Sequence, residues 1–242
     1  EEGTWSETFS LIPGNHFLFP CRFVCDKDGV LHCLAAYHDE NQNVLHNRYV
    51  YFQIDDNSIS PMEEVSPFID GDGRDLVVDS INRPHITYRQ KMMNSPTPMN
   101  DSTIYRFKHN DLWSDPELVV YDPRNQHIIL GYKDSPNIFD IEKHDDGCYI
   151  VHHQKINDVW VSIIVEDIPW YSSDYSFCKF SNQIGMAYQK PEATTVYSDI
   201  YFRSADIISG ITMNNEISPD EIISVKPNPF ENEIEIITTN AL

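Results

Sequence analysis

Apolar residues in this chain come in runs of about four to eight, and turn residues separate the runs. Within the runs apolar and polar residues tend to alternate, which is the period of a β-strand whose two faces differ. Long stretches with the apolar spacing of an amphipathic helix are absent from the sequence. The pattern therefore predicts an all-β chain of short strands joined by tight turns.

Four stretches of the sequence repeat one design, in which a strand and a polar turn lead to a second strand that ends in a ring-bearing residue and a polar one. The stretches are residues 21–38, 75–89, 137–153 and 175–189. Their turns contain Asp, Asn, Gly or Ser, which tolerate positive φ or bond their own backbone. We expect Tyr37, Tyr88, His152 and Tyr188 to occupy equivalent places on second strands.

A third strand is predicted after each repeat, and a fourth element carries a Trp-Ser pair at Trp113-Ser114 and Trp5-Ser6. The third strands are expected at residues 48–53, 103–108, 159–164 and 199–204. Four antiparallel strands per repeat predict a β-propeller, here a fragment with four to five visible blades. The strand at residues 127–132 fits none of the four repeats and indicates a degenerate fifth blade.

Several of these residues resemble the repeats of sialidase-like (BNR-type) propellers. Residues 4–7 (Thr-Trp-Ser-Glu) and 112–116 (Leu-Trp-Ser-Asp-Pro) resemble the strand that follows the repeat turn, and residues 28–37 resemble the opening blade of that family. The resemblance covers residues 1–208 and implies a propeller fold. It does not imply sialidase activity, because Phe19 stands where the family has its first carboxylate-binding arginine and no Asp-box turn is intact.

The C-terminal end carries a second resemblance. Pro227, Asn228, Pro229 and Phe230, followed by an alternating strand from Glu233, resemble the opening of the C-terminal sorting domain of the bacterial type IX secretion system. The sequence thus predicts a propeller at residues 1–208, a linker at 209–220 and the first strand of a truncated β-sandwich sorting domain at 221–242. The resemblance implies the type IX machinery as a partner and a secreted or outer-surface location. An ordinary loop with an edge strand is the alternative.

Charge narrows the list of partners. The chain has 17 Lys and Arg against 38 Asp and Glu, a net charge of −21, which argues against nucleic acid and anionic membrane surfaces as partners. No apolar run reaches the ~18–20 residues of a membrane-spanning helix, so we expect no transmembrane segment. The five cysteines include no Cys-x-x-Cys pair, which argues against a zinc site built on cysteine.

Two sets of residues are candidates for ligand binding. Trp170, Tyr171 and Tyr175 precede the fourth repeat, where they either stack on a sugar or pack in the core. Three carboxylates in a glycine-rich turn form either a calcium site or a solvated loop between blades, and no other cofactor is expected. They are Asp70, Asp72 and Asp75.

The positions of the histidines and arginines indicate structural roles for them and not catalytic or metal-binding ones. We expect His32 and His85 to be hydrogen-bonded structural residues, and at most one metal ligand from the adjacent pair His152 and His153, whose side chains face opposite ways. The strand arginines are expected on solvated faces or in cross-strand ion pairs. They are Arg89, Arg106 and Arg203.

The leading functional prediction is an exported, non-catalytic module that binds carbohydrate or a surface protein. The alternative is a glycoside hydrolase of the sialidase-like superfamily with its site at the propeller axis, where two carboxylates from different blades would have to meet at about 5–9.5 Å. A scaffold without a small ligand is the third hypothesis. The sequence contains no nucleophile elbow, phosphate-binding loop or His-Glu-x-x-His motif.

Overall fold

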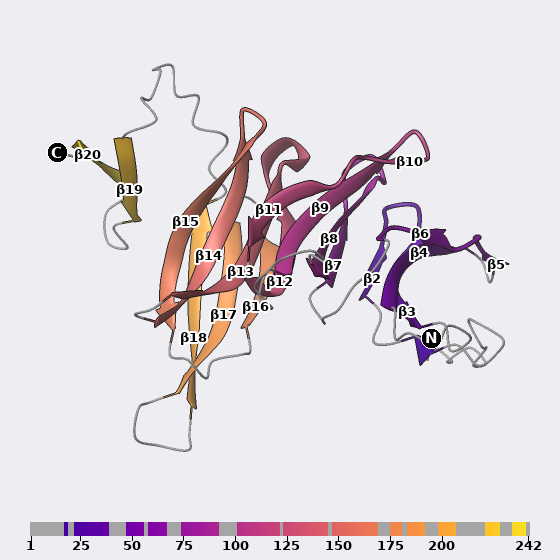
Figure 1. Cartoon of the computed structure of the whole chain (residues 1–242), viewed down its shortest axis with the longest axis horizontal. Coiled ribbons are helices and arrows are strands. Elements are labelled where there is room, and N and C mark those ends of the chain that lie inside the picture. The colour runs from indigo at the N-terminus through magenta and orange to yellow at the C-terminus, as the bar shows by residue number, and fades with distance from the viewer. Residues whose placement is uncertain are drawn as a thin grey trace, which may run out of the picture. The chain divides into compact units, whose positions relative to one another are not determined.

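The structure is a computed structural model that describes the strands of the chain and the tight turns between many of them. It divides into two compact units, residues 1–207 and 208–242. The first unit holds four antiparallel sheets and the second unit holds one two-stranded sheet (Figure 1). The described residues are 17–18, 22–38, 47–55, 58–66, 74–91, 101–121, 123–144, 147–168, 175–180, 183–191, 198–206, 221–227 and 234–240.

Each sheet of the first unit is one blade. Blade 1 contains β1 (Phe17–Leu18), β2 (Arg22–Cys25), β3 (Leu31–His38), β4 (Asn47–Asp55), β5 (Ser58–Ile59) and β6 (Glu63–Glu64). Blade 2 contains β7 (Arg74–Val78), β8 (Pro84–Lys91), β9 (Asp101–His109), β10 (Leu112–Trp113) and β11 (Glu117–Tyr121). Blade 3 contains β12 (Pro123–Leu130), β13 (Pro136–His144), β14 (Gly147–Ile156) and β15 (Val159–Ile168), and blade 4 contains β16 (Tyr175–Phe180), β17 (Gln183–Pro191) and β18 (Ser198–Asp206). One 3-10 turn, η1 (Tyr132–Asp134), joins β12 to β13.

The first long strands of the blades contact one another in chain order, β2 with β7, β7 with β12, and β12 with β16. Later strands of each blade then pair outward by hairpins, from β7 through β8 to β9 and from β12 through β13 and β14 to β15. Inner strands that line one axis, with hairpins radiating from it, are the arrangement of a propeller. The predicted all-β fold with antiparallel blades is thereby confirmed. The described part of the chain contains no helix with the length and apolar character needed to cross a bilayer.

The strand order inside blade 3 corrects the sequence interpretation. Residues 137–153 are not its first and second strands but belong to β13 and β14, the second and third, which pair from Asn137 with Gln154 to His144 with Gly147. Of the strand predicted at 127–132, residues 127–130 are the end of β12, the first strand of this blade, and no fifth blade is needed. His152 therefore lies on a third strand, whereas Tyr37, Tyr88 and Tyr188 lie on second strands as predicted.

A repeated hairpin explains the shift in blade 3. Lys108 to Trp113 and Lys155 to Trp160 share the pattern Lys-x-Asn-Asp-x-Trp, and both turns place Asn and Asp at positive φ, between 49° and 64°. Two successive left-handed residues make a two-residue hairpin turn that matches strand twist. The hairpin joins β9 to β10 in blade 2 and β14 to β15 in blade 3, so Trp160 opens a fourth strand and not a third.

Blades 1 and 2 contain the same buried polar network at the turn between their first two strands. In blade 1 the His32 imidazole lies 3.2 Å from Asp26 through Nε2 and 2.7 Å from the Tyr51 hydroxyl through Nδ1. In blade 2 His85 makes the same two contacts with Asp79, at 3.3 Å, and Tyr105, at 2.6 Å. The prediction that His32 and His85 are hydrogen-bonded structural residues is confirmed.

Successive blades are joined by a second repeated set of contacts, which we call the clasp: a Glu of one blade with a Lys and a Trp of the next. Glu63 accepts hydrogen bonds from Lys108 at 2.6 Å and from the Trp113 indole at 2.9 Å. Glu117 accepts the same pair from Lys155, at 2.8 Å, and Trp160, at 3.2 Å.

Each indole of the clasp also packs edge-on against a tyrosine of the preceding blade. The ring centroids of Trp113 and Tyr51 are 5.2 Å apart, and those of Trp160 and Tyr105 are 5.4 Å apart. Edge-to-face packing at this separation is favourable for aromatic rings. The tyrosines that bind His32 and His85 thus also form the surface on which the next blade rests.

The second unit is a hairpin of β19 (Glu221–Pro227) and β20 (Ile234–Asn240), paired from Glu221 with Asn240 to Pro227 with Ile234. The predicted strand after the proline motif corresponds to β20, and the strand before it, β19, was not expected from the sequence. Pro227 ends β19, because proline has no N–H to continue a ladder. Asn228, Pro229, Phe230 and the predicted linker at 209–220 lie outside the described residues.

Candidate functional site

One side chain from each of the four inner strands lies in a continuous row along the propeller axis. We call this row the axial cluster; it consists of Arg22 on β2, Asp75 on β7, His127 on β12 and Tyr175 on β16. The Arg22 Nε lies 3.7 Å from one Asp75 carboxylate oxygen, and the His127 Nδ1 lies 3.3 Å from the other. The His127 and Tyr175 rings meet edge-on with centroids 5.0 Å apart.

Backbone geometry fixes the acid at the centre of the row. Asp75 accepts hydrogen bonds from its neighbour Leu76 N at 3.0 Å and from Ile128 N of the next blade at 3.1 Å. These bonds hold the carboxylate between blades 2 and 3, so its orientation does not depend on the mobile ends of long side chains. A preorganised acceptor flanked by a cation and two rings can bind the hydroxyl groups and apolar faces of a polar organic ligand.

A β-bulge in β12 turns His127 toward the axis. The pairing of β12 with β13 shifts between Arg124 and His127, and Asn125 in the bulge has φ of 51°. Asparagine tolerates this left-handed conformation better than most residues. The Tyr175 hydroxyl donates a hydrogen bond to the Asn125 carbonyl, which couples the bulge of blade 3 to the inner strand of blade 4.

Exposure is unequal along the row, and Arg22 is its most exposed member. The Arg22 side chain is 51% exposed, whereas Asp75 and His127 are 16% and 21% exposed. Burial raises the pKa of Tyr175 well above its ordinary value, and the negative charges of Asp140 and Asp75 raise it further. The Tyr175 phenol therefore stays protonated at any physiological pH and acts as a hydrogen-bond donor.

From Tyr175, further aromatic side chains continue into the space between blades 3 and 4. Phe177 packs edge-on against Tyr175 at 5.3 Å and stacks on Phe139 at 4.2 Å, and Phe139 stacks on His152 at 4.5 Å, all between ring centroids. These contacts anchor β16 against blade 3 and thereby fix the position of Tyr175.

The structure describes two of the predicted ligand-binding residues, and it brings both into the axial cluster. Tyr175 lies there as part of an aromatic group, and Asp75 lies there as the partner of a histidine and an arginine. Trp170, Tyr171, Asp70 and Asp72 lie outside the described residues, so the sugar-stacking segment and the calcium turn stay predictions.

Sequence reasoning missed Arg22 and His127 as members of the cluster. Arg22 lies three positions after Phe19, the place of the family's first arginine, and His127 lies on the strand that fits none of the four sequence repeats. Two further arginines have structural roles, and the side chain of Arg203 lies outside the described part of the structure. Arg89 forms a cross-strand ion pair with Asp101, as predicted, and Arg106 donates hydrogen bonds to the carbonyls of Ser114 and Val65.

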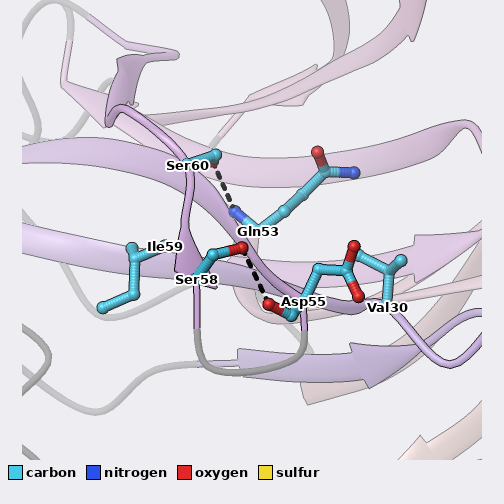
Figure 2. Close-up of a pocket in the computed structure, with 6 residues that line it drawn as sticks. All are labelled: Val30, Gln53, Asp55, Ser58, Ile59 and Ser60. Carbon is cyan, nitrogen blue, oxygen red and sulfur yellow. Dashed lines mark hydrogen bonds between the residues drawn. The ribbon is translucent and has the colours of Figure 1, made fainter.

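Blade 1 contains a small pocket with a volume of about 210 Å³, lined mainly by residues of β4 and the turn that follows it. Figure 2 shows that its serines bond the hairpin backbone: Ser58 donates to the Asp55 carbonyl at 2.8 Å, and Ser60 accepts from the Gln53 N–H at 2.8 Å. The polar groups that line the pocket thus close the β4–β5 turn. The axial cluster is the better candidate site.

The number of carboxylates on the inner strands bears on whether this site can hydrolyse a glycosidic bond. Asp75 is the only Asp or Glu in the described first strands β2, β7, β12 and β16. Hydrolysis of a glycosidic bond by the common mechanism uses two carboxylates that both reach the substrate. The described cluster supplies one such group together with a cation and two rings, a composition suited to binding.

Comparisons with known proteins support the fold. The chain resembles an α-L-arabinanase from Penicillium chrysogenum (TM-score 0.54, 13% identity, 93% of this chain and 78% of that one) and a Hadza microbial sialidase (TM-score 0.52, 11% identity, 86% and 49%). It also resembles an α-L-arabinofuranosidase from Fusarium graminearum (TM-score 0.51, 14% identity, 78% of this chain), of which it spans 62%. No family model and no curated protein matches the sequence. At these identities the likeness concerns the propeller fold.

Proposed function

We propose that this chain is a carbohydrate-binding propeller module whose axial cluster receives a glycan. The observation that carries the proposal is the convergence of Arg22, Asp75, His127 and Tyr175 from four successive inner strands on one carboxylate. Carboxylate and guanidinium groups match the paired hydroxyls of a sugar, and the face of an aromatic ring packs on its C–H groups. The propeller neighbours named above include proteins that act on glycans, which agrees with this ligand class.

Binding assays with a panel of arabino-oligosaccharides and sialosides test the proposal. Arg22→Ala removes a half-exposed cation without opening the core, and we expect it to weaken glycan affinity at least about tenfold, the effect of losing one charged contact. Arg48→Ala is the matched control, because Arg48 pairs with Glu64 at 2.8 Å away from the axial cluster. Equal affinity in both variants, or no glycan bound by the wild-type chain, would contradict the proposal and favour a scaffold.

The same panel separates binding from hydrolysis. If the wild-type chain released reducing sugar and Asp75→Asn abolished the release, the axial cluster would be a glycoside hydrolase site with Asp75 as one of its acids. We expect no release, because the described inner strands offer a single carboxylate. We also expect no release of sialic acid from a fluorogenic sialoside.

We further infer that residues 221–242 form the start of a type IX sorting domain, which makes the whole protein an exported one. The sequence of the proline motif supports this inference: Pro227 ends β19, and the alternating strand β20 follows the motif. In a secretion-competent host, deletion from Glu221 onward should trap the full-length protein in the periplasm. Normal surface or medium yield of the truncated protein would show that the hairpin is an ordinary chain end.

A further inference from the structure

Blade 3 contains a cluster of three possible metal ligands that includes none of the four residues of the axial cluster. Asp140 and Glu142 are alternate residues of β13, so their side chains lie on one face, and His153 of β14 lies beside them. The His153 Nε2 is 3.1 Å from an Asp140 oxygen and 3.6 Å from a Glu142 oxygen. The three ligand atoms all lie within 4.8 Å of one another.

The hydrogen-bonding capacity at the centre of this cluster is unused. The side chains of Asp140 and His153 are both 0% exposed. Within the described part of the chain, neither Asp140 carboxylate oxygen nor the His153 Nε2 has a partner at hydrogen-bond geometry, although they approach one another. A buried carboxylate whose oxygens lack well-aligned hydrogen bonds is costly.

The other ring nitrogen of His153, Nδ1, already has a hydrogen-bond partner. It lies 2.8 Å from the Ser162 hydroxyl on β15, which fixes the ring plane and aims Nε2 at the two carboxylates. When Nδ1 carries the proton and donates it to Ser162, Nε2 presents a lone pair to two negative groups. Three electron donors that face one another can share one cation, and an orienting bond on the far nitrogen is the usual partner of a metal-bound histidine.

The buried aspartates of blades 1 and 2 show the contrast. Asp26 accepts backbone hydrogen bonds from Asp28 and Val30, both at 2.9 Å, and Asp79 accepts two from Ile81 and Arg83. Those carboxylates close a turn and are satisfied by it. Asp140 lies in the middle of a strand, where the β-ladder uses the backbone N–H groups and leaves none for the side chain.

Further polar groups surround the cluster on two sides. The bulge of β12 places Asn125 and Gln126 opposite Asp140, and the Gln126 amide is buried, with neither of its side-chain atoms hydrogen-bonded to the described chain. On the other side Glu142 is 18% exposed and its second oxygen lies 3.1 Å from His144 Nε2, itself 45% exposed. Glu142 is therefore the member of the cluster that reaches solvent.

We propose that Asp140, Glu142 and His153 bind a divalent transition-metal ion of the zinc class, one ligand atom from each residue. One imidazole nitrogen with two carboxylate oxygens is a donor set that zinc accepts in proteins, at about 2.0–2.2 Å, whereas calcium prefers oxygen ligands alone. The ion joins β13 to β14 inside blade 3. This site is separate from the glycan-binding proposal and from the calcium turn predicted at Asp70, Asp72 and Asp75.

The test uses zinc alone and the whole chain. After chelation and dialysis, we expect zinc to restore one bound ion per chain by elemental analysis and to raise the melting temperature. Asp140→Asn and His153→Gln should abolish both effects, and Ser162→Ala should weaken zinc affinity about 10–100-fold by losing the orienting bond. His109→Gln, which removes an exposed histidine at the end of β9, is the matched control and should behave as the wild type.

Cobalt substitution of the wild-type chain keeps the proposal testable even where a variant fails to fold. Co²⁺ at a site with three protein ligands and one or two waters should give visible absorption bands that zinc displaces at one equivalent. A chelated wild-type chain that binds neither ion with this stoichiometry would overturn the proposal. So would an Asp140→Asn variant that binds zinc as tightly as His109→Gln does.

Discussion

The network shared by blades 1 and 2 predicts unequal costs for the same substitution at two equivalent positions. In both Asp26 and Asp79 the Oδ1 atom accepts the turn N–H groups, and the Oδ2 atom faces the histidine. Asp79 Oδ2 also accepts a bond from the Arg83 Nε at 2.5 Å, whereas no arginine contacts Asp26 within the described residues. An Asn at either position keeps Oδ1 and replaces Oδ2 with an amide donor.

The magnitude follows from the bonds that each Oδ2 atom makes. A hydrogen bond to a charged group contributes about 1.5–3 kcal/mol. Asp26→Asn loses one such bond, to His32, and should cost about 1.5–3 kcal/mol of unfolding free energy. Asp79→Asn loses two, to His85 and Arg83, and leaves a guanidinium facing an NH₂ group, so it should cost about 3–5 kcal/mol.

Denaturant unfolding followed by tryptophan fluorescence measures both variants, with an unchanged m-value as the sign that the two states are the same. An Arg83→Lys variant isolates the arginine contribution, because the ammonium cannot reproduce the Nε contact. Equal midpoints for the two Asn variants would refute the reasoning. A larger loss for Asp26→Asn than for Asp79→Asn would do so even more directly.

Three further predictions concern the clasp and the response to pH. Trp160→Ala should cost about 3–5 kcal/mol through lost packing, whereas Glu117→Gln should cost less than about 1 kcal/mol because the Glu117 and Lys155 side chains are 27% and 22% exposed; thermal melts compare the two. Burial lowers the pKa of His152 to about 4, so the stability held above pH 6.5 should fall between pH 6.5 and 4 as the unfolded chain takes up a proton, and His152→Gln should flatten that part of the profile. Burial alone would raise the pKa of Asp79, but hydrogen bonds from Arg83 and His85 outweigh it and lower the pKa; its contribution should therefore be full above about pH 4 and be lost on further acidification, which titration of Asp79→Asn against the wild type detects.

The propeller could be predicted because each hairpin is specified by residues that are close together in the sequence. Alternating strands and turn residues predicted blades 1, 2 and 4 with Tyr37, Tyr88 and Tyr188 on second strands. Blade 3 was misaligned because the turn after His144 reads like the first turn of the other repeats, although it joins the second strand to the third. The shared Lys-x-Asn-Asp-x-Trp pattern would have fixed the register, since it identifies the later hairpin.

The axial cluster could not be predicted from local pattern in the same way. Its four residues are separated by about 50 positions each and meet only because inner strands stack around one axis. The β12 bulge that directs His127 toward Asp75 has no sequence signal beyond an asparagine, a residue that tolerates positive φ. The proposed metal-ligand set has no local sequence signal either, because Asp140 and His153 lie on two neighbouring strands and meet only when β13 pairs with β14.

The clasp has a consequence for the order in which the chain can fold during synthesis. Each blade supplies the glutamate first, and the lysine and tryptophan that complete the contact emerge from the ribosome about 40–50 residues later, with the next blade. Glu63 and Tyr51 therefore stay without their contacts to blade 2 until Trp113 has been translated. Folding should thus advance from blade 1 toward blade 4 in steps, and a ribosome stalled between two blades should hold one protease-sensitive blade at the growing end.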